Sequence, residues 1–117
     1  TQYTLAADRG NEHVAALADP LHPAVLRLIA TAAEAATSCG AWTGVCGELA
    51  ADERATPLLL GLGVRELSMS APAIAAAKQA VRDTDLAAAR ALAGRALDAA
   101  SGEEVRTLLG EASARRA

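Results

Sequence analysis

The sequence predicts an α/β fold built from parallel βα units. Hydrophobic residues make up 52% of the 117 positions, yet Phe is absent and aromatic residues are only 2%, so alanine and leucine fill most of the core. Alanine is the best helix former, which favours helices packed closely through small side chains. Two short strand patterns, at 42–46 and 65–70, alternate with helical patterns. Strands and helices that alternate at these intervals are typical of parallel units.

The first third of the chain predicts a loop, a helix and a strand. Residues 1–12 are mixed in character and end in a turn. Pro23 suits the first turn of a helix that runs from Ala24 to about Ser38. Its expected buried face consists of Val25, Leu28, Ile29 and Ala32. Gly40 ends this helix, and the strand at 42–46 follows.

The middle of the chain repeats the pattern of helix, strand and helix. Asp52 is expected to cap a helix at 53–62, whose leucines are dense enough to be buried on nearly all sides, with Pro57 in its first turn. Residues 65–70 have the length and alternation of a strand. Ser70 then caps a helix that we expect at 72–81.

The last third of the chain predicts two helices and no strand. An alanine-rich helix is expected at 85–99, and a last helix begins at 101–104. Leu86 belongs to the apolar stripe of the first of these helices, and Arg115 and Arg116 favour the C-terminal end of the second through the helix dipole. We therefore divide the chain into residues 1–82, the α/β part, and residues 83–117, an appended helical hairpin.

Two parallel strands do not make a stable closed sheet, because each strand needs neighbours on both sides. Either this segment belongs to a larger sheet or it pairs with another copy of itself. The chain also opens on Thr1 rather than Met, which suggests a piece of a longer protein.

Charge and composition exclude several classes of function. The net charge is -3 and the pI is near 5.3, so a nucleic-acid partner is not expected. No apolar run approaches the ~20 residues that span a bilayer, and no signal peptide is visible, which predicts a cytoplasmic protein with no membrane partner. Cys39 and Cys46 are too few for the disulfide framework of a small secreted domain, and with His13 and His22 they do not resemble a zinc site.

Cys46 lies between Gly44 and Gly47 at the end of the first strand pattern. Glycines leave a ligand free to approach the backbone. A cysteine thiol has an ordinary pKa of about 8.5, so at neutral pH it is mostly protonated and can act as an acid. Taken alone, these residues favour the simpler interpretation that Cys46 is a small buried hydrophobic residue.

Four blocks of the chain resemble, in order, enzyme I of the bacterial sugar phosphotransferase system, a phosphoenolpyruvate–protein phosphotransferase. The blocks are Thr1–Glu12, His22–Ile29, Trp42–Ala50 and Leu67–Ala71. Four blocks in register are far more specific than any one of them. The resemblance is close over about residues 1–82 and looser over the tail.

The resemblance implies that this chain is the C-terminal part of a (β/α)8 TIM barrel, comprising its last two strands and their helices. It implies that Arg9 contacts phosphoenolpyruvate, a role that suits a guanidinium fork facing phosphate and carboxylate. It also implies that Cys46 is the proton donor, placed at the C-terminal end of a barrel strand where such barrels keep their chemistry. This reverses the simpler interpretation of Cys46.

The resemblance further implies Mg²⁺ in the intact enzyme, with its ligands upstream of Thr1, so that this chain itself holds no metal site. The implied partners are phosphoenolpyruvate, pyruvate and a phosphocarrier protein, and self-association into a homo-oligomer is expected. Neither His13 nor His22 matches the histidine that accepts the phosphoryl group, which belongs to a separate N-terminal domain in this family.

Three alternatives remain open. The parent protein is either enzyme I or a related pyruvate phosphate dikinase or phosphoenolpyruvate synthase, or else the chain acts alone as a non-catalytic dimerisation module. In each case we expect the isolated chain to be inactive. For Trp42 and Met69 we expect positions in the core. Glu48 is either a neighbour that supports Cys46 or a carboxylate at a helix start.

Overall fold

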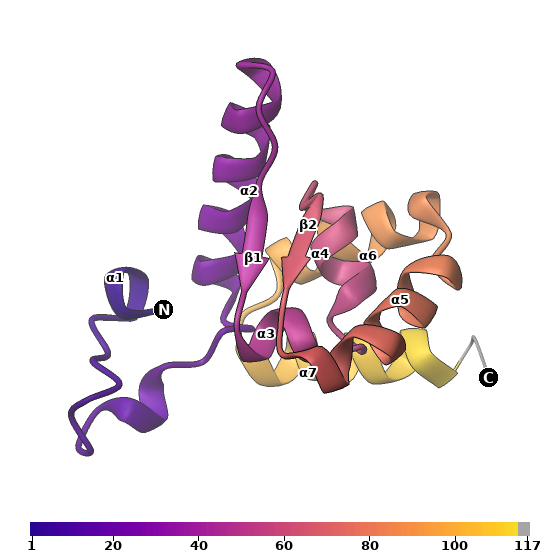
Figure 1. Cartoon of the computed structure of the whole chain (residues 1–117). Coiled ribbons are helices and arrows are strands. Elements are labelled where there is room, and N and C mark those ends of the chain that lie inside the picture. Colours follow the sequence, from indigo (N-terminus) through magenta and orange to yellow (C-terminus); the bar gives the residue numbers. More distant parts are fainter. Residues whose placement is uncertain (115–117) are drawn as a thin grey trace.

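The computed structural model of the chain describes residues 1–114 and shows a mixed α/β fold that is mostly helical (Figure 1). Arg115 and Arg116, expected to favour the end of the last helix, lie outside the described residues. The elements in order are α1 (Gln2–Leu5), the 3₁₀ turn η1 (Ala15–Leu17), α2 (Pro23–Ser38), β1 (Gly44–Cys46), α3 (Glu48–Ala51), α4 (Thr56–Gly61), β2 (Glu66–Ser68), the 3₁₀ turn η2 (Ala71–Ala73), α5 (Ile74–Arg82), α6 (Leu86–Asp98) and α7 (Gly102–Ala114).

The two strands are adjacent and parallel, which confirms the predicted βα units. Gly44 pairs with Glu66, Val45 with Leu67, and Cys46 with Ser68. Both strands are shorter than expected. The ladder begins only after Thr43, whose carbonyl oxygen accepts hydrogen bonds from the backbone N–H groups of Arg65 and Glu66 at 3.0 and 3.3 Å.

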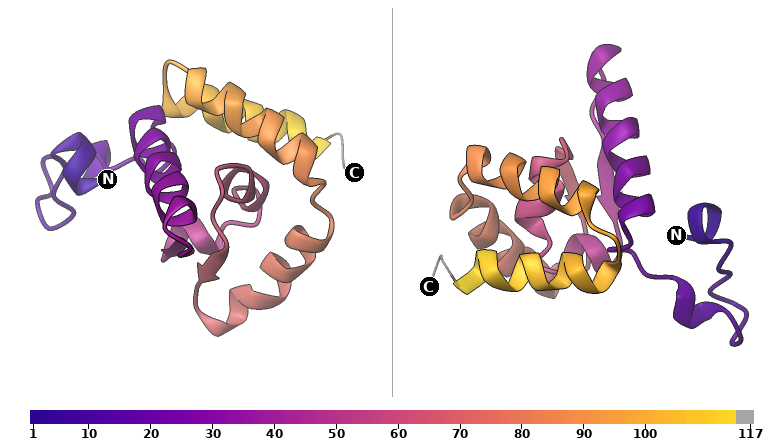
Figure 2. Two further views of the ribbon diagram at one scale, coloured as in Figure 1. Left: turned by 90° about the horizontal axis from the view of Figure 1, so that it is seen from above. Right: turned by 180° about the vertical axis from the view of Figure 1, so that it is seen from behind.

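Among residues 1–114 the sheet contains these two strands alone, so the outer edge of each strand has no strand partner. Seen from above, α4 lies in the middle and α2, α5, α6 and α7 surround it (Figure 2). Each strand alternates between an exposed and a half-buried side chain. Gly44, Cys46, Glu66 and Ser68 therefore share the open face of the sheet, and Val45 and Leu67 share the face that is partly covered.

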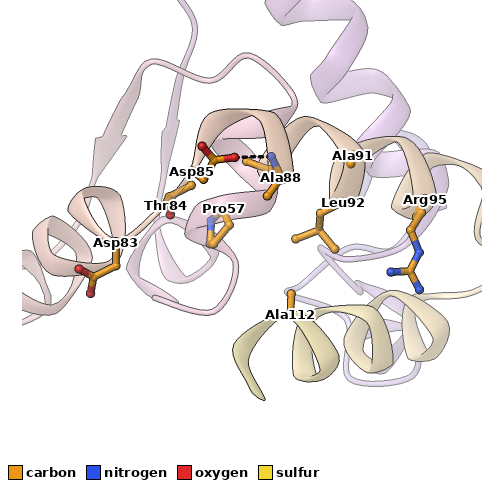
Figure 3. Close-up of a pocket in the computed structure, with 10 residues that line it drawn as sticks. Pro57, Asp83, Thr84, Asp85, Ala88, Ala91, Leu92, Arg95 and Ala112 are labelled. Atoms are coloured by element: carbon orange, nitrogen blue, oxygen red, sulfur yellow. Dashed lines mark hydrogen bonds between the residues drawn. The ribbon is translucent and has the colours of Figure 1, made fainter. Parts of the chain in front are cut away.

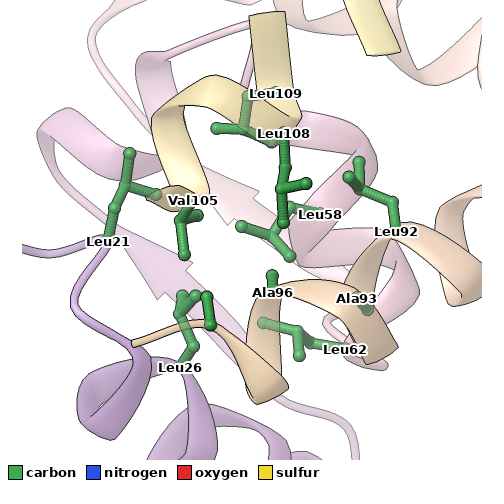
Figure 4. Close-up of a cluster of buried hydrophobic side chains, with 11 residues drawn as sticks. Leu21, Leu26, Leu58, Leu62, Leu92, Ala93, Ala96, Val105, Leu108 and Leu109 are labelled. Carbon is green, nitrogen blue, oxygen red and sulfur yellow. The ribbon is translucent and has the colours of Figure 1, made fainter. Parts of the chain in front are cut away.

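The main hydrophobic core forms where α4 meets α6 and α7 (Figure 4). Its buried members are Leu21, Leu26, Leu58, Leu62, Leu92, Ala93, Ala96, Ala99, Val105, Leu108 and Leu109. As the sequence predicts, the leucines of α4 are deeply placed, and Leu58 and Leu59 are fully buried. The helices expected as an appended hairpin supply much of this core, so residues on both sides of position 82 share it.

The segment after β1 differs from the expectation. A single helix was expected at 53–62, but the structure has the short α3 followed by α4, which starts at Thr56. The Asp52 carboxylate accepts a hydrogen bond from the backbone N–H of Arg54 at 3.0 Å, and the backbone carbonyl oxygen of Asp52 accepts one from the N–H of Ala55. Asp52 therefore holds a turn, and the helix begins only after that turn. Pro57 lies in the first turn of α4 as expected.

Three further expectations about burial and capping are wrong. On α2, Val25 is buried and Ile29 is partly buried against the core as expected, but Leu28 and Ala32 are exposed. The other buried residues of this helix are Pro23, Leu26 and Ala33. On α6, Leu86 is also exposed, because it lies in the first turn at the rim of the core. Ser70 precedes the turn η2 but makes no side-chain cap, and α5 starts only at Ile74.

Within residues 1–114, no helix has both the length and the apolar character needed to cross a bilayer.

Candidate functional site

The candidate site lies where β1 and β2 end. Parallel strands bring their carboxyl ends to the same edge of the sheet, so Cys46 and Ser68 are neighbours in the register. Both side chains are exposed, and the thiol of Cys46 is free. The structure thus places Cys46 on the open face at the end of a strand, and the interpretation of a buried packing residue does not hold in this chain.

The backbone at Gly47 turns the chain away from β1 directly after Cys46. Gly47 has φ +84° and ψ −157°, a conformation that essentially only glycine adopts. A side chain at Gly47 would meet nothing within 4 Å, so the backbone conformation and not lack of space requires glycine here. The N–H of Gly47 donates to the carbonyl oxygen of Ser68 at 3.2 Å, which joins the two strand ends.

Two acidic residues follow Cys46 on the side of α3. Glu48 is the first residue of α3, and it lines a hollow together with Arg54 and Arg106. Partial burial raises the pKa of Asp52, but hydrogen bonds from the side chain and backbone of Arg54 outweigh this and leave that pKa below its ordinary value. Asp52 is therefore an anion at neutral pH and is already paired with Arg54 at 3.0 Å.

Arg9 lies on an exposed turn of the N-terminal segment. The carboxylate of Asp8 accepts the N–H of Gly10 at 2.9 Å, and the side chain of Asn11 accepts the N–H of His13 at 3.0 Å. These bonds close the turn around Arg9. Figures 1 and 2 show residues 1–20 extending to one side of α2, away from the sheet. The structure therefore does not bring Arg9 next to Cys46.

The other residues singled out by the sequence have structural roles or lie exposed on the surface. The Nδ1 atom of His22 accepts the N–H of Ala24 at 3.2 Å and caps α2, while His13 and Cys39 are exposed. Trp42, expected in the core, is 66% exposed, because it precedes the ladder and donates through Nε1 to Glu66 at 3.0 Å. Met69 is half-buried. The described residues contain no group of three or more His, Cys, Asp and Glu side chains that would hold a metal ion.

Sequence reasoning missed two features near the site. The sequence predicts Ser68 only as part of a strand, and its place beside Cys46 depends on the register. Asp19 and Arg106 form a bidentate ion pair with Nη–Oδ distances of 2.7 and 2.9 Å. This ion pair connects the N-terminal segment to α7. Neither feature has a local signal, because the partners lie far apart in the sequence.

The hollow drawn in Figure 3 lies between α4, α6 and α7, away from the strand ends. Pro57, Leu92 and Ala112 make much of its lining apolar. The Asp85 carboxylate at its rim accepts the N–H of Ala88 at 2.8 Å and so caps α6. This polar group therefore serves the helix.

Comparison with known proteins identifies the family. A profile described as "PEP-utilising enzyme, PEP-binding domain" matches residues 1–86 of this chain. The chain belongs to the PEP-utilising enzyme family. Its relatives include the phosphoenolpyruvate-protein phosphotransferase of Haemophilus influenzae, 49% identical over 111 residues that cover 95% of this chain. The protein of the same name from Staphylococcus carnosus is 47% identical over 94% of it. This member of the PEP-utilising enzyme family spans about 19% of the length of each of these relatives.

Proposed function

We propose that this chain is the C-terminal part of the phosphoenolpyruvate-binding barrel of a phosphoenolpyruvate–protein phosphotransferase. In the complete enzyme, the phosphoryl group of phosphoenolpyruvate passes to a histidine of the enzyme and then to a carrier protein for sugar uptake, and pyruvate is released. The 49% identity to the Haemophilus influenzae protein carries this proposal. The two parallel strands, whose outer edges have no strand partner within residues 1–114, support a place within a larger barrel.

The proposed chemistry of this chain is the protonation of enolpyruvate by Cys46. After the phosphoryl group leaves, the thiol gives its proton to the methylene carbon of the enolate. The electron pair of the carbon–carbon double bond forms the new C–H bond, the enolate oxygen becomes the carbonyl oxygen of pyruvate, and a thiolate remains. The exposed position of Cys46 at a strand end supports this role, since a substrate can reach it there.

Arg9 is the proposed contact to phosphoenolpyruvate. Its guanidinium group suits a ligand that carries both phosphate and carboxylate. Among the described residues, the hydrogen bonds that hold the turn carrying Arg9 are local ones, from Asp8 and Asn11. We therefore propose that the rest of the barrel positions this turn over the strand ends in the complete enzyme.

Several properties of the complete enzyme stay proposals. Mg²⁺ would be held by residues outside this chain and would supply charge neutralisation at the phosphate. We also propose a cytoplasmic, homo-oligomeric enzyme that acts with a phosphocarrier protein, and a boundary near residue 82 between the barrel and its C-terminal helices.

Pyruvate phosphate dikinase, phosphoenolpyruvate synthase and a non-catalytic dimerisation module remain the alternatives. A nucleotide-grasp domain upstream would favour the first two, and a carrier-binding helical domain would favour the phosphotransferase.

The proposal is tested with Cys46→Ala in the complete enzyme. We expect pyruvate release to fall by about 10²–10⁴-fold, the usual contribution of a general acid, while phosphoenolpyruvate binding persists. Cys39→Ala is the matched control, because Cys39 is also an exposed thiol but lies at the end of α2. Undiminished turnover in Cys46→Ala would refute the proton-donor role.

We also expect the isolated chain to release no pyruvate, since its structure does not bring Arg9 and Cys46 together.

A further inference from the structure

The side chain beside Cys46 on the open face of the sheet is that of Ser68. The two residues are paired in the parallel register, and neighbouring strands lie about 4.8 Å apart. Both residues occupy the exposed positions of the alternating pattern, so their side chains leave the same face of the sheet. The hydrogen bond from the N–H of Gly47 to the carbonyl oxygen of Ser68, at 3.2 Å, holds this alignment at the last rung of the ladder.

The other polar groups around Cys46 have different tasks. Glu66, two residues before Ser68 on the same face, accepts the Nε1–H of Trp42 at 3.0 Å. Glu48 on α3 lines the hollow beside Arg54 and Arg106. Gly44 has no side chain, and the side chain of Met69 has no N–H or O–H group. Of the side chains on β1, β2 and α3, that of Ser68 is the uncharged hydrogen-bond donor next to the thiol.

We propose that Ser68 is a positioning residue for Cys46, whose hydroxyl donates a hydrogen bond to the sulfur and stabilises the thiolate left after proton transfer. This inference rests on the proposed function. Within residues 1–114 the structure shows no hydrogen bond between the Ser68 hydroxyl and the Cys46 sulfur, but both residues are exposed. Catalytic hydrogen bonds are often formed only when the substrate is bound.

The first test measures the reactivity of the Cys46 thiol in the complete enzyme with Cys39→Ser as background. The tryptic peptide 28–54 then carries Cys46 as its only cysteine, so its alkylation by iodoacetamide is followed by mass spectrometry. In Ser68→Ala we expect the pH midpoint of alkylation to rise by roughly half to one unit, the equivalent of one hydrogen bond to sulfur. Ser68→Thr retains the hydroxyl and restores the midpoint. Ser70→Ala, an exposed serine beyond the strand, leaves it unchanged.

The second test measures pyruvate release by the same variants. Ser68→Ala is expected to lower kcat several-fold with an unchanged KM, and Ser68→Thr to recover it. An unchanged alkylation midpoint in Ser68→Ala would overturn the role of Ser68 even if Cys46 is the proton donor. Full turnover in Cys46→Ala would instead overturn the proton-donor role of Cys46, and the alkylation experiment would still report whether the serine stabilises the thiolate.

Discussion

At the scale of single residues, the conformation of Gly47 decides where the Cys46 thiol lies. Its φ of +84° and ψ of −157° belong to a region that other residues avoid. The turn there directs the chain into α3 and lets its N–H bond to the carbonyl oxygen of Ser68. On the sequence alone, we expect the glycines around Cys46 to leave room for a ligand near the backbone. The structure adds that Gly47 is needed for its backbone.

We therefore predict that Gly47→Ala destabilises the protein by about 1–3 kcal/mol, the usual cost of a strained backbone conformation. Urea unfolding followed by circular dichroism measures this change. The control is Gly110→Ala in α7, where a side chain would meet nothing within 4 Å and φ is not positive. That substitution is expected to stabilise α7 slightly. Equal stabilities for Gly47→Ala and the unchanged chain would contradict the backbone argument.

At the scale of elements, the close contact between α4 and α6 depends on small residues. A methyl group added at Gly61 would overlap the backbone carbonyl group of Ala89, and it would also press on the side chain of Ala93. Gly61 lies near the end of the helix that the sequence predicts at 53–62. Its role in the structure is to let α6 approach α4, and the two helices pack their leucines and alanines into the core through this approach.

We predict that Gly61→Ala destabilises the protein by roughly 1–3 kcal/mol, because the backbone of α6 must shift away. Gly94→Ala in α6 is the matched control, since nothing lies within 4 Å of the added methyl group. There the same substitution should stabilise the helix by about 0.5–1 kcal/mol. Thermal unfolding of both variants gives the comparison, and a Gly61→Ala protein as stable as Gly94→Ala would refute the close-packing argument.

At the scale of the whole molecule, the ion pair between Asp19 and Arg106 joins segments that are 87 residues apart in the sequence. The Arg106 guanidinium donates two hydrogen bonds to the carboxylate and holds the pKa of Asp19 below its ordinary value of 3.8. The backbone N–H of Leu21 donates to the same carboxylate at 2.9 Å. Asp19 thus holds the chain just before α2 against the start of α7.

The pH dependence of stability follows from this lowered pKa. Because the folded state binds the proton of Asp19 less readily than the unfolded chain, the ion pair stabilises the fold above the ordinary pKa of 3.8, and this contribution is lost as pH falls through the lower folded pKa. Since both side chains are partly exposed, we expect it to be only about 0.5–1 kcal/mol.

Asp19→Asn tests this linkage by denaturant unfolding at pH 7 and at pH 3. The variant should lose about 0.5–1 kcal/mol at pH 7 and show a smaller loss of stability toward pH 3. Asp98→Asn makes the same charge change at an exposed position near the end of α6 and controls for net charge. If the free energy of unfolding changed with pH equally in Asp19→Asn and in the unchanged chain, the ion pair would have no part in the pH dependence of stability.

The sequence by itself determined the order of the longer helices and of the two strands, the parallel pairing of these strands and the family, but it predicted a loop where α1 lies and a single helix at 53–62 where the structure has α3 and α4. The predictions that hold follow from local signals, such as proline at helix starts, leucine density in α4 and the short sequence blocks that resemble the family. Tertiary structure alone decided the register that sets Ser68 beside Cys46, the close approach at Gly61, the bond between Asp19 and Arg106, and the exposure of Leu28, Trp42 and Leu86. The physical reason is that burial and register depend on which distant segments cover a face, and short-range patterns carry no information about those partners.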